Sequence, residues 1–293
     1  MMTRVVIKYK IEMVMKNFQG KVAAISGAGS GIGQQLAILL AQQGCHLSLS
    51  DISLAGLQQT LALLKESTVK ISTHMVDVAE REQVQYWAEQ TVREHGQVNL
   101  IFNNAGVALA STVEGASYED LTWITNINFW GVVYGTKEFL PYIKQTQEGH
   151  IVNISSIFGI AAQPTQSAYN ASKFAVRGFT EALRQELDIQ RCGVSALCVH
   201  PGGVRTNIAK SARSNQSLKT LGIETDGTQQ DFEKLLRTPP EKAAKQILKA
   251  IRRNQRRVLI GADAKILDFL QRLFPAGYQR FSVWLNRLQT WKD

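Results

Sequence analysis

KVAAISGAGSGIG, residues 21–33, reads as a short buried strand that runs into a glycine-rich turn and the start of a helix. A helical pattern of leucines follows and stops at Gly44. Glycines let a backbone turn tightly and approach a pyrophosphate at the N-terminus of a helix. The spacing of Gly27, Gly31 and Gly33 differs from G-x-G-x-x-G, and a flexible loop without a ligand is the alternative. The order strand, glycine turn, helix predicts a dinucleotide-binding unit.

An acidic residue follows the second predicted strand. Residues 46–50, HLSLS, form that strand, and Asp51 stands at its end. A carboxylate there can accept hydrogen bonds from the adenosine ribose hydroxyls, and it would repel a 2′-phosphate. Ser30 and Ile52 offer no cation for that phosphate, so we expect NAD rather than NADP. A helix N-cap role for Asp51 or Ser53 is compatible with this interpretation.

Predicted strands and helices continue to alternate through the first half of the chain. A helix over 54–64, a strand over 69–76, a helix over 84–95 and a strand over 98–106 follow in turn. This β-α-β alternation predicts an α/β fold with a doubly wound parallel sheet. Ligands bind such sheets at the carboxyl ends of the strands. The residues expected at those ends are Asp51, Asp77, Asn103, Ala105 and Gly106.

A second pattern lies in the middle of the chain. Tyr169 and Lys173 form Tyr-x-x-x-Lys, and residues four apart share one face of a helix. Free tyrosine titrates at about 10, and a fixed cation nearby favours the phenolate. Such a tyrosine can exchange a proton with an alcohol or carbonyl oxygen. Ser156, thirteen residues earlier at a predicted strand end, could hold the same oxygen.

With these motifs together, the chain resembles the short-chain dehydrogenase/reductase family over roughly residues 17–260. Ser26 departs from the usual Thr before the first glycine but keeps the hydroxyl, so we expect little effect. The matching motifs, in order, are Gly27/Gly31/Gly33, Asp77-Val78, Asn103-Asn104-Ala105-Gly106, Asn128, Ser156, Tyr169-x-x-x-Lys173 and Pro201-Gly202-x-Val204-x-Thr206.

The resemblance implies a role for each matching position. Tyr169 would be the acid/base, Ser156 would polarise the substrate oxygen, and Lys173 would lower the tyrosine pKa and bind the nicotinamide ribose. Asn128 would hold a water that links Lys173 to solvent, and His200 is expected to be structural. The cofactor contacts implied besides Tyr169 and Lys173 are Gly27, Ser30, Gly31, Ile32, Gly33, Asp51, Asp77, Val78, Asn104, Ala105, Gly106, Pro201, Gly202, Val204 and Thr206.

The resemblance also implies the domain plan. We expect one Rossmann-type domain over 17–261, with about seven strands and helices on both faces of the sheet. Residues 1–16 form an N-terminal extension, and 203–237, which lacks clear periodicity, is the expected substrate loop. Residues 262–293 form a C-terminal helical extension.

That extension carries two apolar stripes separated by Pro275. We expect two helices that pack over the substrate cleft or against a partner subunit, with an interfacial membrane helix as the alternative. Residues 241–293 hold twelve Lys/Arg against four Asp/Glu, whereas the first 240 residues hold 21 against 20. The stripes are Ile266, Leu267, Leu270, Leu273 and Phe274, then Phe281, Trp284, Leu285, Leu288 and Trp291.

Composition narrows the remaining choices. Three scattered cysteines suggest neither a disulfide framework nor a metal site, and no apolar run approaches the length of a membrane span. We expect a cytoplasmic homodimer or homotetramer that binds no nucleic acid. The sequence therefore predicts an enzyme that moves a hydride between NAD(H) and a secondary alcohol or carbonyl. The alternatives are an NADPH-dependent reductase of a lipid-like aldehyde or ketone and a non-catalytic NAD(H) sensor.

Overall fold

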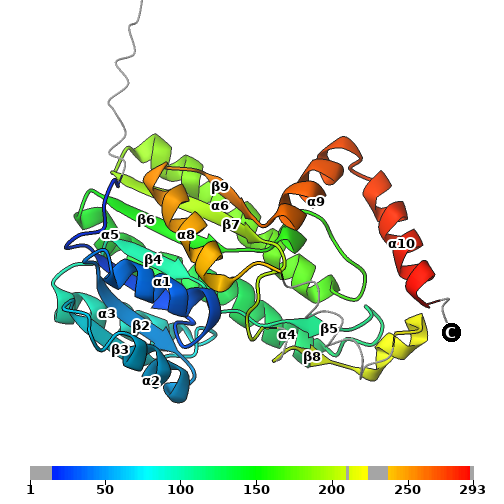
Figure 1. Cartoon of the computed structure of the whole chain (residues 1–293), viewed down its shortest axis with the longest axis horizontal. Coiled ribbons are helices and arrows are strands. Elements are labelled where there is room, and N and C mark those ends of the chain that lie inside the picture. The colour runs from blue at the N-terminus through cyan, green and yellow to red at the C-terminus, as the bar shows by residue number, and fades with distance from the viewer. Residues whose placement is uncertain (1–14, 209–210, 224–236, 291–293) are drawn as a thin grey trace, which may run out of the picture.

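Seven parallel strands form the central sheet of the computed structural model, in the order β3-β2-β1-β4-β6-β7-β9 (Figure 1). The expected doubly wound α/β fold is confirmed. The structure describes residues 15–208, 211–223 and 237–290, so residues 1–14, the loop segment 224–236 and Trp291 lie outside it. The strands are β1 Val22–Ser26, β2 His46–Asp51, β3 Ile71–Met75, β4 Leu100–Asn103, β6 Gly149–Ile154, β7 Val194–Pro201 and β9 Arg257–Ile260.

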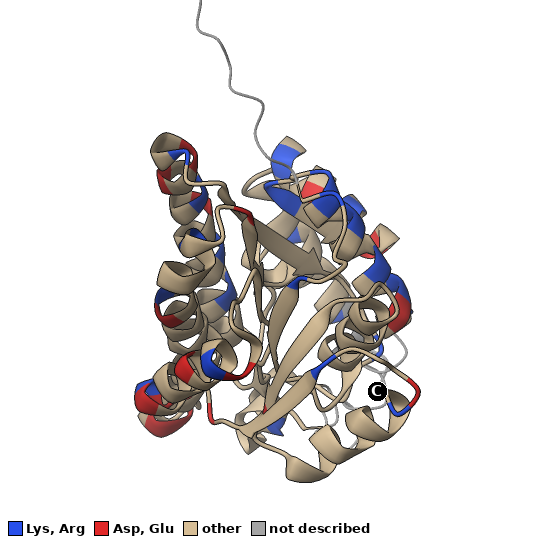
Figure 2. Cartoon of the chain, turned by 90° about the vertical axis from the view of Figure 1, so that its left-hand side faces the viewer, with Lys and Arg blue, Asp and Glu red and all other residues tan. Residues whose placement is uncertain are grey.

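Helices cover both faces of this sheet (Figure 2). The sheet therefore separates two hydrophobic cores. Alternate side chains of a strand point to opposite faces, so Ile25 of β1 enters one core and Ala24 the other. The first core contains α1 Gly31–Ala41, α2 Leu54–Leu63 and α8 Pro240–Arg252. The second contains α3 Arg81–His95, α5 Gly131–Gln145 and α6 Ser167–Gln190.

A buried polar network fixes β4 and β6 against two helices of the second core. The Asn103 amide donates to Asn153 Oδ1 at 2.8 Å and to Thr136 of α5 at 3.1 Å. The Asn153 amide donates to Thr180 of α6 at 3.0 Å. Buried polar groups are costly unless they are paired, and each donor here has a partner. The network therefore sets how α6 lies on the ends of these strands.

The expected irregular substrate loop is partly regular where it is described. β8 Arg213–Ser214 pairs with β5 Leu109–Ala110, and the 3-10 helix η3 Gln216–Leu221 follows. The Arg213 guanidinium lies 3.7 Å from the centre of the Trp123 ring and 2.9 Å from Asp120 of α4 Tyr118–Thr125. These contacts join residues about ninety positions apart, so no local periodicity could reveal them.

Two C-terminal helices are present as expected, α9 Ala262–Leu273 and α10 Gly277–Thr290. Within this single chain, the cleft covers few of the stripe side chains that the structure describes. Leu267 lines the cleft, whereas Phe281, Trp284 and Leu285 are exposed. The α10 side chains that face the rest of the protein are Tyr278 and Ser282, which form hydrogen bonds with Ala162 and Gln163.

The C-terminal basic excess begins on α8. Figure 2 shows Lys and Arg gathered along this side of the molecule, while the helices of the opposite face carry both signs. Within the described residues, no helix has both the length and the hydropathy required to cross a bilayer.

Gly33 and Gly178 make a matched pair of helical glycines for a stability test. A Cβ at Gly33 would lie 2.2 Å from the Gly27 carbonyl oxygen, whereas one at Gly178 would meet nothing within 4 Å. We expect Gly33→Ala to lower the free energy of unfolding by about 1–3 kcal/mol through overpacking. Gly178→Ala should raise it by about 0.4–1 kcal/mol. Urea unfolding measures both, and equal shifts in the two variants would contradict the packing described for the turn.

Candidate active site

The glycine turn between β1 and α1 is held close to the end of β4. Gly27 has a φ of 64°, in the left-handed region that favours glycine, and a Cβ there would lie 2.9 Å from the Ala105 Cα. Gly31 has a φ of 55°, and a Cβ there would lie 3.0 Å from the Thr206 side chain. Glycine at both positions therefore lets three loops meet at the N-terminus of α1.

Ser26 and Asn104 tie the ends of β1 and β4 together. The Ser26 hydroxyl accepts from the backbone N–H groups of Asn104 and Ala105 at 3.0 and 3.1 Å. The Asn104 amide donates to the carbonyl oxygens of Ser26 and Gly27. A hydroxyl at position 26 is sufficient for these contacts, as the sequence suggested.

Asp51 stands at the end of β2 and faces the same turn. Its two carboxylate oxygens accept from the backbone N–H groups of Gly29 and Ser53, each at 2.9 Å. Ser53 caps α2, because its hydroxyl accepts from Gly56 N–H. The carboxylate is thus fixed at the edge of the cleft, and each oxygen keeps a further lone pair for a ligand.

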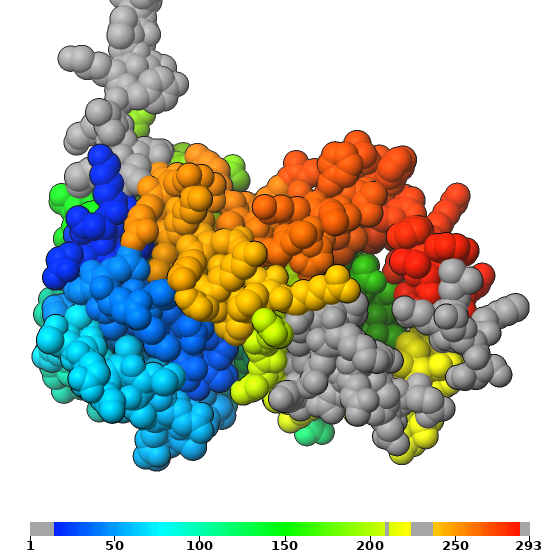
Figure 3. Space-filling view, in the orientation of Figure 1, coloured from blue at the N-terminus to red at the C-terminus, as the bar shows by residue number. Residues whose placement is uncertain are grey.

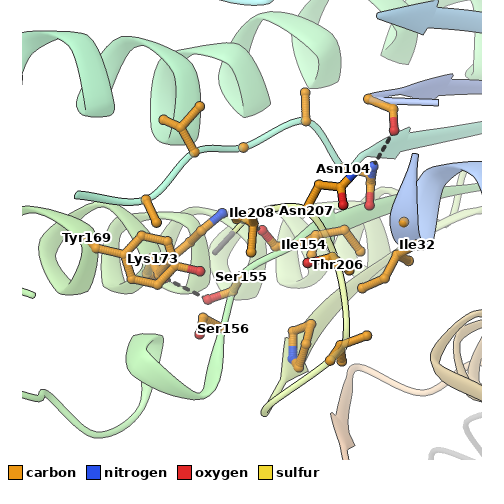
Figure 4. Close-up of a pocket in the computed structure, with 18 of the residues that line it drawn as sticks. Ile32, Asn104, Ile154, Ser155, Ser156, Tyr169, Lys173, Thr206, Asn207 and Ile208 are labelled. Carbon is orange, nitrogen blue, oxygen red and sulfur yellow. Dashed lines mark hydrogen bonds between the residues drawn. The ribbon is translucent and has the colours of Figure 1, made fainter. Parts of the chain in front are cut away.

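Tyr169 and Lys173 begin α6, which two hydrogen bonds fasten to the end of β6 (Figure 4). The Lys173 ammonium donates to the Ile154 carbonyl oxygen at 3.1 Å, and the Ser155 hydroxyl donates to the Lys173 carbonyl oxygen at 2.8 Å. The Lys173 ammonium lies 5.7 Å from the centre of the Tyr169 ring. Phenol, ammonium and serine hydroxyls are therefore brought to one wall of the cleft.

The structure distinguishes between the two adjacent serines. Ser155 is engaged with the α6 backbone, whereas the Ser156 hydroxyl accepts from Phe158 N–H at 3.1 Å and bonds the Tyr169 side chain. His200 Nδ1 lies 2.8 Å from the Ser156 carbonyl oxygen. Since a carbonyl can only accept, that nitrogen carries the proton. Burial lowers the pKa of His200 to about 4, so the ring is neutral at physiological pH. It donates its hydrogen bond to the backbone of Ser156.

Burial controls the protonation of the tyrosine and the lysine. It raises the pKa of Tyr169, and the hydrogen bond with Ser156 opposes that rise. Burial also lowers the pKa of Lys173 to about 8. The expectation that Lys173 would bring the tyrosine pKa below its ordinary value is therefore wrong for the free chain. The Lys173 ammonium donates to the Ile154 carbonyl, and the loss of water around the phenol raises the pKa of Tyr169.

Asn128 and Gly33 differ from the other predicted site residues, since neither lines the cleft. Asn128 is fully buried in the π-helix η1 Asn126–Trp130, where it accepts from Val107 N–H and donates to the Val107 carbonyl and to Ser172. Gly33 is buried in α1 against Gly27. Asn128 does approach the site, because a Cβ at Gly106 would lie 3.1 Å from its Oδ1 and 3.4 Å from the Lys173 Nζ.

A cavity of about 1440 Å³ joins these elements at the carboxyl ends of the strands. Drug-sized ligands occupy pockets of about 300–1,000 Å³, so this cavity has room for a larger ligand or for two. The predicted residues that line it are Gly27, Ser30, Gly31, Ile32, Asp51, Asp77, Val78, Asn104, Ala105, Gly106, Ser156, Tyr169, Lys173, Pro201, Gly202, Val204 and Thr206.

Sequence reasoning missed several lining residues, and Asp263 of α9 is the most informative. Its carboxylate accepts from Gly203 N–H at 2.6 Å. A Cβ added at Gly202 would lie only 2.2 Å from the same carboxylate. Asp263 therefore braces the loop after β7 from sixty residues away. No motif marks this residue. The other lining residues that the sequence did not single out are Trp123, Phe158, Gln163 and Gln166, whereas Ile208 and Ile266 lie in the expected substrate loop and C-terminal extension.

Fold and site together define a Rossmann-type oxidoreductase with a nicotinamide-dinucleotide cleft. A family model described as short chain dehydrogenase matches residues 21–217. The chain belongs to the short-chain dehydrogenase/reductase family.

Relatives and solved structures agree with this assignment. SadH of Mycobacterium tuberculosis, named as an oxidoreductase, is 45% identical over 268 residues, covering 91% of this chain and 95% of that protein. Estradiol 17-beta-dehydrogenase 11 of Homo sapiens is 30% identical over 282 residues, covering 96% and 87%. A short-chain dehydrogenase/reductase of Burkholderia phymatum in complex with NAD superimposes with a TM-score of 0.82 at 28% identity, covering 89% and 95%.

The buried ammonium of Lys173 predicts a pH dependence of stability. Its pKa falls from 10.5 to about 8 on folding. Below pH 8 both states hold the proton and the native state bears the cost of the buried charge. Between pH 8 and 10 only the unfolded state keeps the proton, so stability rises with pH. Relative to Lys173→Met, we expect the wild-type free energy of unfolding to rise over this range by up to about 3 kcal/mol. Urea unfolding across the range measures the difference, and parallel curves for the two proteins would contradict it.

Proposed function

We propose that this chain is an oxidoreductase that transfers a hydride between NAD(H) and a secondary alcohol or the corresponding carbonyl compound. The proposal rests on one observation: the cleft that begins at the glycine turn is also lined by Tyr169, Ser156 and Lys173, which lie close together. A phenol and a hydroxyl directed at one point suit proton exchange with a substrate oxygen.

The cleft fits a nicotinamide dinucleotide. The turn from Gly27 to Ile32 presents the N-terminus of α1, where a pyrophosphate binds favourably. Asp51 would accept hydrogen bonds from the adenosine ribose, and Asp77 and Val78 lie in the same lining. When bound, the cofactor supplies or accepts the hydride.

The chain's own residues would then control the substrate oxygen. Ser156 would donate a hydrogen bond to it, because its hydroxyl already accepts from Phe158 N–H. Tyr169 would give its proton to the oxygen in reduction and take one in oxidation. Because burial raises the tyrosine pKa, the phenol is protonated at neutral pH. That state suits carbonyl reduction, whereas oxidation should accelerate as the pH rises.

The open end of the cleft indicates an apolar substrate. Trp123, Phe158, Ile208 and Leu267 contribute apolar surface there, and Gln163 adds an amide for a second polar group. The name of the human relative refers to a steroid alcohol. We therefore propose a lipid-like or multi-ring secondary alcohol or ketone as the substrate class.

NADPH-dependent reduction is the second candidate, and it rests on two cations. Arg237 and Lys242 line the same cleft, and either could pair with a phosphate. Asp51 favours NAD(H), because a carboxylate bonded to Gly29 and Ser53 cannot easily turn away from a 2′-phosphate.

A non-catalytic NAD(H) sensor is less well supported. Cofactor binding could use the lysine alone, but it gives no reason to place a phenol beside a buried ammonium, whose removal from water is costly. Lys173 is only 3% exposed.

Tyr169→Phe tests the catalytic assignment. The change removes only the phenolic oxygen, so turnover should fall by about 10²–10⁴-fold while the NADH dissociation constant stays unchanged. Absorbance of reduced nicotinamide, followed with a panel of hydrophobic ketones, measures turnover, and fluorescence titration measures binding. Tyr86→Phe, at an exposed tyrosine of α3, is the matched control. A near-normal rate in Tyr169→Phe would refute the role.

Asp51 variants test the cofactor preference. Asp51→Ala should weaken NAD binding by about tenfold or more through lost charged hydrogen bonds, and it should improve NADP binding by relieving repulsion. Asp51→Asn keeps an acceptor but removes the charge, so it should improve NADP with a smaller loss of NAD. Steady-state kinetics with both cofactors decide the matter. A wild-type preference for NADP(H) would reverse the proposal.

A further inference from the structure

α10 directs the hydroxyl groups of Tyr278 and Ser282 toward the protein and leaves the side chains of Phe281 and Trp284 exposed. Tyr278 Oη accepts from Ala162 N–H, and the Ser282 hydroxyl donates to Gln163 Oε1, each at 3.1 Å. Phe281 and Trp284 stack on each other with ring centres 5.8 Å apart, yet they are 52% and 55% exposed. A surface helix in water normally has the reverse arrangement.

α9 also exposes large apolar side chains. Its buried residues are Ala264 and Asp268, and the Asp268 carboxylate accepts from Arg272 at 2.9 Å. The apolar side chains of Ile266, Phe269 and Leu273 are more than half exposed. Both helices thus leave large apolar side chains exposed.

Exposed apolar side chains are concentrated on this pair of helices. Eight of the nineteen large hydrophobic residues exposed in the described chain fall within residues 266–285. Figure 3 shows α9 and α10 next to each other at one end of the molecule. Large exposed apolar patches mark sites of contact, and so many exposed apolar side chains on two successive helices indicate such a site. We define the outer face of α9–α10 by these eight residues: Ile266, Phe269, Leu273, Phe274, Phe281, Val283, Trp284 and Leu285.

Positive charge predominates around this outer face. From residue 269 to 290 the sequence contains Arg272, Arg280 and Arg287 and no Asp or Glu. Arg280 and Arg287 are both exposed. Aromatic side chains interspersed with arginine are the composition of helices that lie in a membrane interface.

We propose that the outer face of α9–α10 docks on an anionic lipid surface. Anionic headgroups complement the basic excess of residues 241–293, to which the exposed Arg280 belongs, while the acyl boundary takes the apolar side chains. A second copy of the chain would bring arginine against arginine with no carboxylate from this segment. The chain's own cleft cannot cover the face, because the hydrogen bonds of Tyr278 and Ser282 direct its aromatic side chains outward.

Docking would bring the mouth of the cleft to the lipid. Ile266 and Leu267 of α9 line the cleft, and Gln163 both lines it and bonds Ser282 of α10. An apolar substrate dissolved in the bilayer would then enter without crossing water. The docking itself does not depend on the proposed reaction.

Co-sedimentation of the full chain with lipid vesicles tests the proposal. Vesicles of phosphatidylcholine with about 30 mol% phosphatidylglycerol should bind the chain at least about tenfold more tightly than phosphatidylcholine alone, and added salt should weaken this binding. The double variant Phe281→Ala/Trp284→Ala should lose about tenfold or more. Arg280→Glu should lose about tenfold.

Two controls match these changes elsewhere on the surface. Tyr86→Ala/Tyr118→Ala removes two exposed aromatics, and Lys249→Glu inverts an exposed charge on basic α8; both should bind vesicles within about twofold of wild type. NADH titration of every variant reports whether the fold and cofactor cleft are intact. Equal binding to neutral and anionic vesicles would overturn the proposal. So would a loss of oligomerisation, rather than of vesicle binding, in Phe281→Ala/Trp284→Ala, because the face would then be a subunit interface.

Discussion

The junction between the end of β6 and the start of α6 determines the geometry of the site. Lys173 donates to the Ile154 carbonyl, and Ser155 donates to the Lys173 carbonyl, so strand and helix are fixed to each other at two points. Tyr169 lies one turn before Lys173, and Ser156 lies one residue after Ser155. The two bonds therefore leave phenol and hydroxyl little freedom to separate. The amide network from Asn103 through Asn153 to Thr180 holds the same strand and helix deeper in the core.

Burial at this junction costs free energy, and it also changes the pKa values of the two groups that are buried there. The junction buries an ammonium and a phenol, which lowers the pKa of the lysine and raises that of the tyrosine. A tyrosine in this state holds its proton at neutral pH and can donate it. A bound cofactor would add its own charge and hydroxyls to the same wall. The direction of proton transfer therefore depends on the ligands present as well as on the tyrosine–lysine pair.

Local patterns in the sequence were sufficient for the fold and for most of the cleft. Strand and helix periods, the glycine turn, and Pro275 between two helices each act over a few residues, and the structure contains all of these elements. Long-range contacts were not predictable. Asp263 reaches Gly203 across sixty residues, and Arg213 reaches Asp120 across ninety-three. The tyrosine pKa depends on burial that no motif encodes, and the outward face of α10 depends on which side Tyr278 and Ser282 bond.

Transfer of deuterium from the cofactor tests the central claim of hydride transfer most directly. The chain would be incubated with NADH carrying deuterium at C4 of the nicotinamide, in either stereochemical position, and with hydrophobic ketones. Mass spectrometry would then examine the alcohols formed. We expect one deuterium at the carbinol carbon from one of the two labelled cofactors. Tight binding of NADH without any labelled alcohol, across ketones and aldehydes and with NADPH as well, would contradict the account and favour a nucleotide sensor.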